Sequence, residues 1–314
     1  MKSSIIVHPD ELSKEWIDKV TQAGIGAIGI HPVGGKRSAQ SLETLLQQAR
    51  TAEFRSLIDY ARNCGLEVEY EFHAMGYLLP RDLFETHPEY FRMQQDGERT
   101  KDYNFCPSSE EAMELVAERA SQVASALYGS SHDFYFWLDD GRNLHCKCQR
   151  CRHLSASDQQ MMVLNRILLE IKKQIPDARM AYLAYMDSIV PPAQVIAEEG
   201  IFLEYAPFEK YTAKGDNAAE LIAREKEMVA PLMSAFFGEP KKVLEYWYDN
   251  SLYSRWTKPP RKFVLREDAM RLEIHEYKEM GFDSISTFAC YLGEEYRELY
   301  GDVDITPFGD AVLE

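Results

Sequence analysis

Eight strand-like runs alternate with helix-like segments along the whole chain, and this alternation limits the possible folds more than any other feature of the sequence. An alternation of this kind that starts on a strand predicts a closed (β/α)8 TIM barrel. An open doubly wound sheet would begin with a glycine-rich turn for phosphate, whereas the first turn here is His8-Pro9-Asp10-Glu11. The expected strands cover residues 4–8, 27–32, 66–74, 134–140, 180–185, 201–206, 242–249 and 284–291.

The segments between these runs carry apolar residues about every 3.6 positions, as amphipathic helices do. The helix expected at 108–127 follows Pro107 and opens with a Ser-Ser-Glu-Glu cap signal, and the helix at 267–280 is followed by Gly281. Without a repeat or a low-complexity linker, we expect residues 1–314 to form a single (β/α)8 barrel domain. The remaining expected helices cover 11–22, 41–63 (broken), 158–174 and 218–233.

Two connections between a strand and the next helix are long, at residues 75–108 after the third strand and 141–157 after the fourth. In a barrel both lie on the C-terminal face, where active sites are built. Loops of this length usually carry function or are disordered, and their aromatic, His and Cys content favours order.

The fourth expected strand ends in two adjacent carboxylates, Asp139 and Asp140. Burying a carboxylate without a partner costs free energy, so we expect this pair to have a function. Strand residues alternate between the two faces, and the face opposite the helices points into the barrel. This alternation predicts that one opening is surrounded by His8, His31, Glu71, His73, Asp139, Glu245, Trp247 and Asp249, with the direction of Glu204 undecided.

So many acids at one opening would be too costly to bury without a ligand or shared protons. Acids with aromatic neighbours suit sugar hydrolysis, which needs one carboxylic acid to protonate the leaving oxygen and a second carboxylate to attack or to activate water. Aromatic rings would stack on sugar faces, and the candidates are Trp137, Trp247, Tyr248 and Trp256.

A dense thiol cluster, Cys146-Lys-Cys148-Gln-Arg-Cys151, lies in the second long loop. Three ligands from one turn need a fourth to close a structural zinc site, and Cys106 at the end of the first long loop is the expected one, with His145 or His153 as substitutes. Free thiols or one disulfide are the alternative. We expect no organic cofactor.

Several motifs carry a resemblance to a bacterial domain family of unassigned function with a CxCxxC loop. They are Glu71-Phe-His73, Leu79-Pro80, His87-Pro-Glu-Tyr-Phe91, Cys106, Asp140, Cys146-x-Cys148-x-x-Cys151, Ala184-Tyr185 and Pro191-Pro192. That family is similar to the (β/α)8 barrels of α-glucuronidases and β-N-acetylhexosaminidases. The resemblance implies a (β/α)8 barrel with glycosidase-like chemistry. Hexosaminidase-like barrels end strand four in an acidic pair whose second member is the general acid, and this chain has Asp140 where those enzymes have Glu.

We therefore expect a glycoside hydrolase-like enzyme in which Asp140 is the general acid and Asp139 raises its pKa by like-charge repulsion. Glu245 is the expected nucleophile or base. The expected sugar-binding residues are His31, Glu71, His73, Tyr185, Glu204, Trp247 and Asp249.

Two other readings stay open at this stage. The strand-end histidines with Glu71, Glu204 and Asp249 could hold a catalytic divalent metal, as in sugar isomerases or metal-dependent hydrolases, although no HxH pair ends the first strand. A non-catalytic carbohydrate-binding barrel would keep the same aromatic residues.

The formal net charge of -16 argues against nucleic acid or an anionic membrane as the partner, so a carbohydrate is the expected one. No run reaches the roughly 20 apolar residues of a membrane span, and residues 1–8 lack the long apolar region of a signal peptide. Six cysteines, three of them within six residues, suggest a reduced, cytoplasmic protein. The sequence leaves the oligomeric state open.

Overall fold

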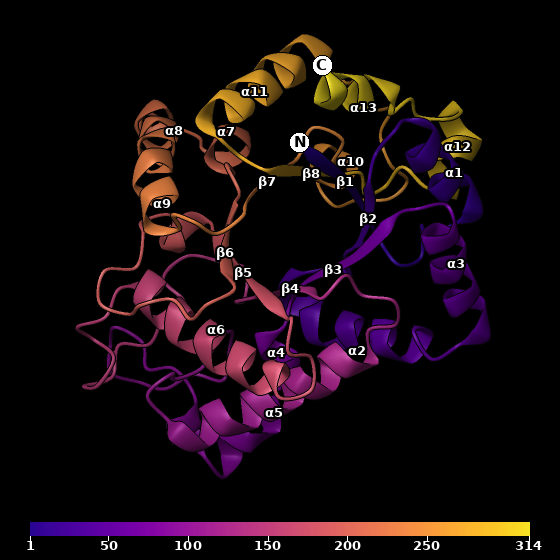
Figure 1. Cartoon of the computed structure of the whole chain (residues 1–314). Helices are drawn as coiled ribbons and strands as arrows, with labels where there is room; N and C mark the ends of the chain where they lie inside the picture. Colours follow the sequence, from indigo (N-terminus) through magenta and orange to yellow (C-terminus); the bar gives the residue numbers. More distant parts are fainter.

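The computed structural model describes residues 1–314, and its eight parallel strands close into a barrel in sequence order (Figure 1). Closure is made by the first and last strands, which pair from Lys2↔Ser284 to Ile6↔Phe288. The predicted (β/α)8 barrel is confirmed. The strands are β1 (Lys2–Val7), β2 (Ala27–Ile30), β3 (Glu67–His73), β4 (Asp133–Trp137), β5 (Arg179–Ala184), β6 (Ile201–Tyr205), β7 (Lys241–Glu245) and β8 (Ser284–Phe288).

The helices form a ring outside the strands (Figure 1). The long helix expected over 41–63 is broken into two at a short turn, and the one expected over 218–233 also divides in two. The α-helices are α1 (Lys14–Gln22), α2 (Ser38–Gln48), α3 (Ala52–Asn63), α4 (Met75–Leu78), α5 (Glu110–Ala126), α6 (Ala156–Lys172), α7 (Glu209–Thr212), α8 (Ala218–Glu227), α9 (Val229–Ala235), α10 (Asn250–Tyr253), α11 (Glu267–Met280), α12 (Glu294–Tyr300) and α13 (Thr306–Leu313).

Local chemistry explains several helix ends. Ser155 and Asp158 form a reciprocal capping box that starts α6, and the Thr51 side chain caps α3. Gly281 ends α11 at φ 87°, a left-handed conformation that glycine adopts without strain. None of the helices has the length and apolar composition of a membrane-spanning segment.

Two apolar cores hold the barrel together. The larger, of 67 buried residues, lies between the strands and the helices, and Phe134 and Phe136 of β4 belong to it. The smaller, of 10 buried residues, fills the barrel and includes Tyr135 and Trp137 of the same strand. Both faces of each strand are therefore buried, so the polarity of a residue does not by itself show whether it points inward.

The middle of the barrel holds one ammonium group among three carboxylates. Lys242 of β7 lies 3.0 Å from Glu69, 2.8 Å from Glu71 and 3.9 Å from Glu204. Burial raises the pKa of Glu71 to about 7 and that of Glu204 well above its usual range, even though Lys242 opposes both shifts. At Glu69, by contrast, Lys242 outweighs burial and lowers the pKa of the carboxyl group. The cluster thus approaches neutrality by pairing Lys242 with Glu69 and keeping protons on Glu71 and Glu204.

Two aromatic side chains of β4 complete this cluster. The Tyr135 hydroxyl donates to Glu69 at 2.9 Å, and the Trp137 indole N–H donates to Glu204 at 2.7 Å. Glu71 and Glu204 are fully buried, and neither lines a cavity at the strand ends. The expected role of these two acids as sugar ligands is therefore wrong, because Lys242 and Trp137 already engage them inside the barrel.

Replacing Lys242 by methionine should lower the free energy of unfolding by about 3–5 kcal/mol, because it leaves the ionised carboxylate of Glu69 without its cation. The loss should be larger at pH 8 than at pH 5, since protonation relieves the uncompensated charge. Urea unfolding at the two pH values measures it. Lys2→Met is the control, because the Lys2–Glu67 pair is exposed and contributes about 1 kcal/mol or less. Equal losses in the two variants would contradict this account.

Candidate active site

A cavity of about 520 Å³ opens at the carboxyl ends of the strands. Its floor is apolar and is made by inward-facing side chains of four strands, namely Trp137, Leu183, Leu244 and Phe288. The floor separates the cavity from the Lys242 cluster. Of the residues predicted for the opening, His8, His31, His73 and Asp249 line this cavity, and so do the predicted site residues Asp140 and Tyr185.

The three histidines form a row along one wall, and each donates its Nδ1–H to a backbone carbonyl of the neighbouring strand end. His8 donates to His31 at 2.7 Å, His31 to Glu71 at 2.8 Å and His73 to Leu138 at 2.5 Å. A carbonyl only accepts, so Nδ1 carries the hydrogen and Nε2 of the neutral ring is an acceptor. The row therefore offers acceptors to the hydroxyl groups of a ligand.

His31 stays neutral at physiological pH. Burial, together with its neighbours His8 and His73, lowers its pKa well below the usual range. The loop after β2 approaches the row closely at Gly34, where an added Cβ would lie 3.0 Å from Cδ2 of His73. Glycine at this position keeps the wall of the cavity open.

Asp140 turns into the cavity just after β4. Its Oδ1 accepts a hydrogen bond from the Tyr185 hydroxyl at 3.1 Å, and Tyr185 follows β5. Both residues were expected at the site, and both line the cavity.

Asp139 does not line this cavity, which corrects the prediction that it faces the opening. The chain turns after Trp137, and Asp139 accepts from Arg81 at 2.9 Å while its backbone N–H donates to Asn104 at 2.8 Å. Burial raises its pKa, and Arg81 opposes the shift. Because Arg81 compensates its charge, Asp139 is not available to repel Asp140, and its contacts are those of a support for the loop.

Glu245 and Trp247 lie on the outside of the barrel, so the predicted direction of their strand is wrong. Glu245 is fully buried and accepts from Lys210 at 2.6 Å, Tyr277 at 2.5 Å and Tyr211 at 2.8 Å. These donors come from α7 and α11, so Glu245 joins the helices to β7. The Trp247 indole donates to Glu273 of α11 at 2.6 Å.

The second carboxylate of the cavity is Asp249, which follows β7. Its Oδ1 accepts from the Ser251 hydroxyl at 2.6 Å and from the backbone N–H groups of Ser251 and Leu252 at 3.0 and 3.1 Å. Burial raises the pKa of Asp249, although these donors oppose the shift.

Tyr246 lies close to both acids of the cavity, and no feature of the sequence had marked it. Burial raises its pKa well above the usual range, with Asp140 and Asp249 as the next causes. The alternation that was expected to point Glu245 and Trp247 into the barrel would place Leu244 and Tyr246 on the opposite face, toward the helices. The cavity thus brings two carboxylates from the ends of β4 and β7 to the same tyrosine.

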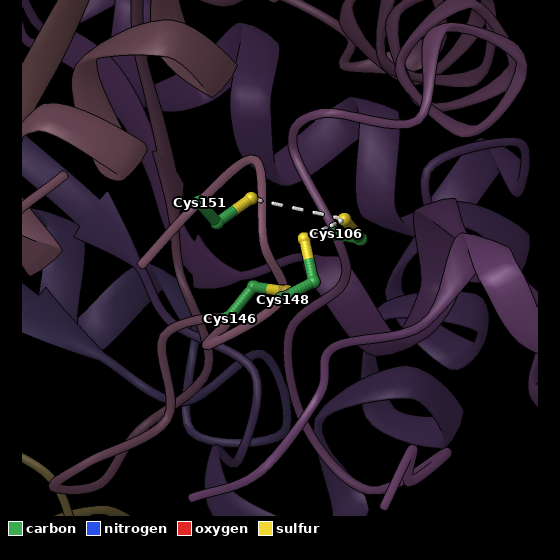
Figure 2. Close-up of side chains that lie close together, drawn as sticks. All are labelled: Cys106, Cys146, Cys148 and Cys151. Carbon is green, nitrogen blue, oxygen red and sulfur yellow. Dashed lines mark hydrogen bonds between the residues drawn. The ribbon is translucent and has the colours of Figure 1, made fainter. Parts of the chain in front are cut away.

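The four cysteines predicted to group together do so between the two long loops (Figure 2). Sγ of Cys106 lies 3.7 Å from that of Cys148 and 3.8 Å from that of Cys151, and Cys146 belongs to the same cluster. All four are buried. The Gln159 side chain binds the backbone of Cys146 through both its oxygen and its nitrogen, which fixes the loop.

The comparisons with solved structures find glycoside hydrolase barrels. A glycoside hydrolase family 5 enzyme from Prevotella bryantii, solved with a xyloglucan tetradecasaccharide, has 11% identity and a TM-score of 0.53, covering 96% of this chain and 86% of that one. A β-galactosidase from Rahnella sp. has 11% identity and a TM-score of 0.57, covering 100% of this chain and 55% of that one.

The family 20 catalytic modules of a pneumococcal exo-β-D-N-acetylglucosaminidase have 12% identity and a TM-score of 0.51, covering 99% of this chain and 82% of that one. At such identities the likeness shows the fold alone. No curated protein matches the chain.

One family profile matches residues 39–223, which is more than half of the chain and includes His73, Asp140 and the four clustered cysteines. The family is described as a domain of unknown function. The chain therefore belongs to this family, DUF4838, and its domain is a (β/α)8 barrel of the kind found in glycoside hydrolases.

Proposed function

We propose that this protein is a glycoside hydrolase-like enzyme whose two working carboxylates are Asp140 and Asp249. The observation that carries the proposal is their position: both line one cavity at the carboxyl ends of β4 and β7. Glycoside hydrolysis needs such a pair on either side of the bond that breaks. The similar barrels include enzymes named for carbohydrate substrates, which supports the same ligand class here.

In this proposal Asp140 is the proton donor to the leaving oxygen, with the Tyr185 hydroxyl orienting its carboxyl group. Asp249 takes the role that the sequence had suggested for Glu245. Its Oδ1 is held by the Ser251 hydroxyl and two backbone amides, which leaves the other oxygen to attack the sugar or to activate water.

The cavity walls would bind the sugar between these acids. Nε2 of His31 and of His73 would accept from sugar hydroxyls, since Nδ1 of each ring is engaged elsewhere. The aromatic floor and Trp256 at the rim are suited to stack on sugar faces.

Asp140→Asn and Asp249→Asn should each lower kcat by roughly a hundredfold to ten-thousandfold, because each removes one of the two proton-transfer or nucleophilic groups. A panel of aryl glycosides measures this. The loss in Asp140→Asn should be smallest for substrates with a very acidic leaving phenol, which needs no proton. Asp302→Asn, at an exposed carboxylate, is the control. Full activity in either active-site variant would refute its role, and saturable binding without turnover in the parent protein would favour a binding barrel.

The acidic limb of the pH–rate profile should report Asp249, which must be ionised to act. Since burial raises its pKa above the ordinary value of 3.8, the rate should fall as the pH drops through a value above 3.8. Ser251→Ala removes a donor that favours the ionised form, so the limb should move to higher pH. An unchanged or lowered limb in Ser251→Ala would argue against Asp249 as the base.

We further propose that the four clustered cysteines bind a structural zinc ion. Four thiolate sulfurs at about 2.3 Å from a tetrahedral zinc lie about 3.8 Å from one another, close to the distances from Cys106 to Cys148 and Cys151. A bound ion would join the loop after β3 to the loop after β4. The first loop also supplies Arg81 and Asn104, which hold Asp139 beside Asp140. The metal would then stabilise one wall of the active site.

Elemental analysis of the purified protein should find about one zinc ion per chain. Cys106→Ser should lose most of this zinc and lower the melting temperature, because metal binding contributes to folding. Cys64→Ser is the matched control, since Cys64 lies outside the cluster. Absence of metal from protein purified without chelator, or full zinc retention in Cys106→Ser, would refute the site.

A further inference from the structure

A second cavity, of about 920 Å³, adjoins the first. The two share Tyr246, Asp249, Leu252 and Trp256, so one residue of the proposed catalytic pair lies at their junction. We call the second cavity the side groove. Its walls are α7, α10, the segment 255–266 and the start of α11.

The side groove is rich in aromatic rings. Tyr211, Trp247, Tyr253 and Phe263 line it beyond the shared residues. Trp256 stands at the border between the two cavities and is 63% exposed. Aromatic faces with this spread suit a chain of sugar rings rather than a single compact ligand.

Backbone conformation sets Trp256 at this border. Arg255 and Trp256 both have φ of 54°, a left-handed conformation that non-glycine residues rarely adopt. The Trp256 N–H donates to the Ser251 carbonyl at 2.7 Å, which secures the turn. Strained residues of this kind concentrate at ligand sites, where the surrounding structure enforces them.

The charges around the two cavities have the opposite sign to the protein as a whole. The chain has a formal net charge of -16, yet five basic side chains and only two acidic ones line the side groove. Lys210 is paired with Glu245 and Glu273. The other cations, none of which forms an ion pair, are Lys214, Arg255, Arg261 and Arg266 in the side groove and Lys36 and Arg37 at the mouth.

We propose that the side groove binds a run of anionic sugar units, carrying carboxylate or sulfate groups, that leads to the bond cleaved between Asp140 and Asp249. This inference rests on the proposed glycosidase function and adds the class of substrate. Arginine guanidinium groups pair with carboxylates and sulfates through two parallel hydrogen bonds, while the aromatic rings take the sugar faces. The net negative charge of the protein repels a polyanion as a whole, so the unpaired cations of the side groove would also direct it to this face.

The charges favour a glycan over a single-stranded nucleic acid, which aromatic and basic side chains also bind. Asp140 and Asp249 line the mouth where the groove ends, and they would repel a phosphodiester chain that continued past it. A chain of sugar acids is compatible with this end, because the glycosidic bonds between its units are uncharged and only one such bond has to reach the two carboxylates.

Calorimetry on the Asp140→Asn protein tests the proposal without turnover. The probes are an oligogalacturonate, a sulfated oligosaccharide and a neutral cello-oligosaccharide of matched length, with a single-stranded oligonucleotide as the fourth. At least one acidic glycan should bind about tenfold or more tightly than the neutral one, and its affinity should weaken with added salt. The first two probes distinguish carboxylate from sulfate.

Arg255→Gln with Arg261→Gln should lower the affinity for the acidic glycan by about tenfold and leave that for the neutral glycan nearly unchanged. The matched control is Arg50→Gln with Arg62→Gln, two exposed arginines that line neither cavity. Equal affinity for neutral and acidic glycans, tighter binding of the oligonucleotide, or no effect of the groove variant would overturn the proposal.

The same measurements separate this inference from the function on which it rests. Selective binding of an acidic glycan without cleavage of any glycan by the parent protein would refute the glycosidase proposal and leave the groove as a binding site. Asp140-dependent cleavage of neutral glycans, with no preference for acidic ones, would refute the groove and leave the glycosidase.

Discussion

The barrel depends on how its interior is filled. One ammonium group, Lys242, lies among Glu69, Glu71 and Glu204 in the middle, and an apolar layer that includes Leu244 covers it toward the mouth. These groups need one another because Glu71 and Glu204 are fully buried and Lys242 and Glu69 nearly so. The apolar layer then serves as the floor of the upper cavity, so the chemistry proposed there is separated from the acids that stabilise the barrel.

The upper cavity is built from short extensions of the strands. Each histidine of the row donates to a carbonyl at the next strand end, so barrel closure itself orients the rings. Asp140 and Asp249 follow two strands that are not neighbours, β4 and β7, and Tyr246 lines the same cavity as both. Long-range pairing of the strands, rather than any local motif, brings the two carboxylates to one cavity.

The two long loops and the side groove give this barrel its own features. The cysteine cluster ties the loop after β3 to the loop after β4, and Arg81 and Asn104 extend that tie to Asp139. On the other side, the segment around Trp256 opens a basic and aromatic groove next to Asp249. One side of the mouth is thus joined by contacts between the two loops, and the other offers the proposed surface for an extended ligand.

The sequence alone determined the eight strands, the long loops after β3 and β4, and the grouping of Cys106 with Cys146, Cys148 and Cys151, because hydrophobic period, cap residues and thiol spacing are local signals. Which acids reach the mouth follows from the packing of the whole barrel. Alternation indicates the inward face only where the other face differs in polarity, but both faces of a barrel strand are buried. Leu244 and Tyr246 therefore point inward, Glu245 points outward to Lys210 and Tyr277, and Asp139 follows a turn to Arg81 that no spacing rule foretells.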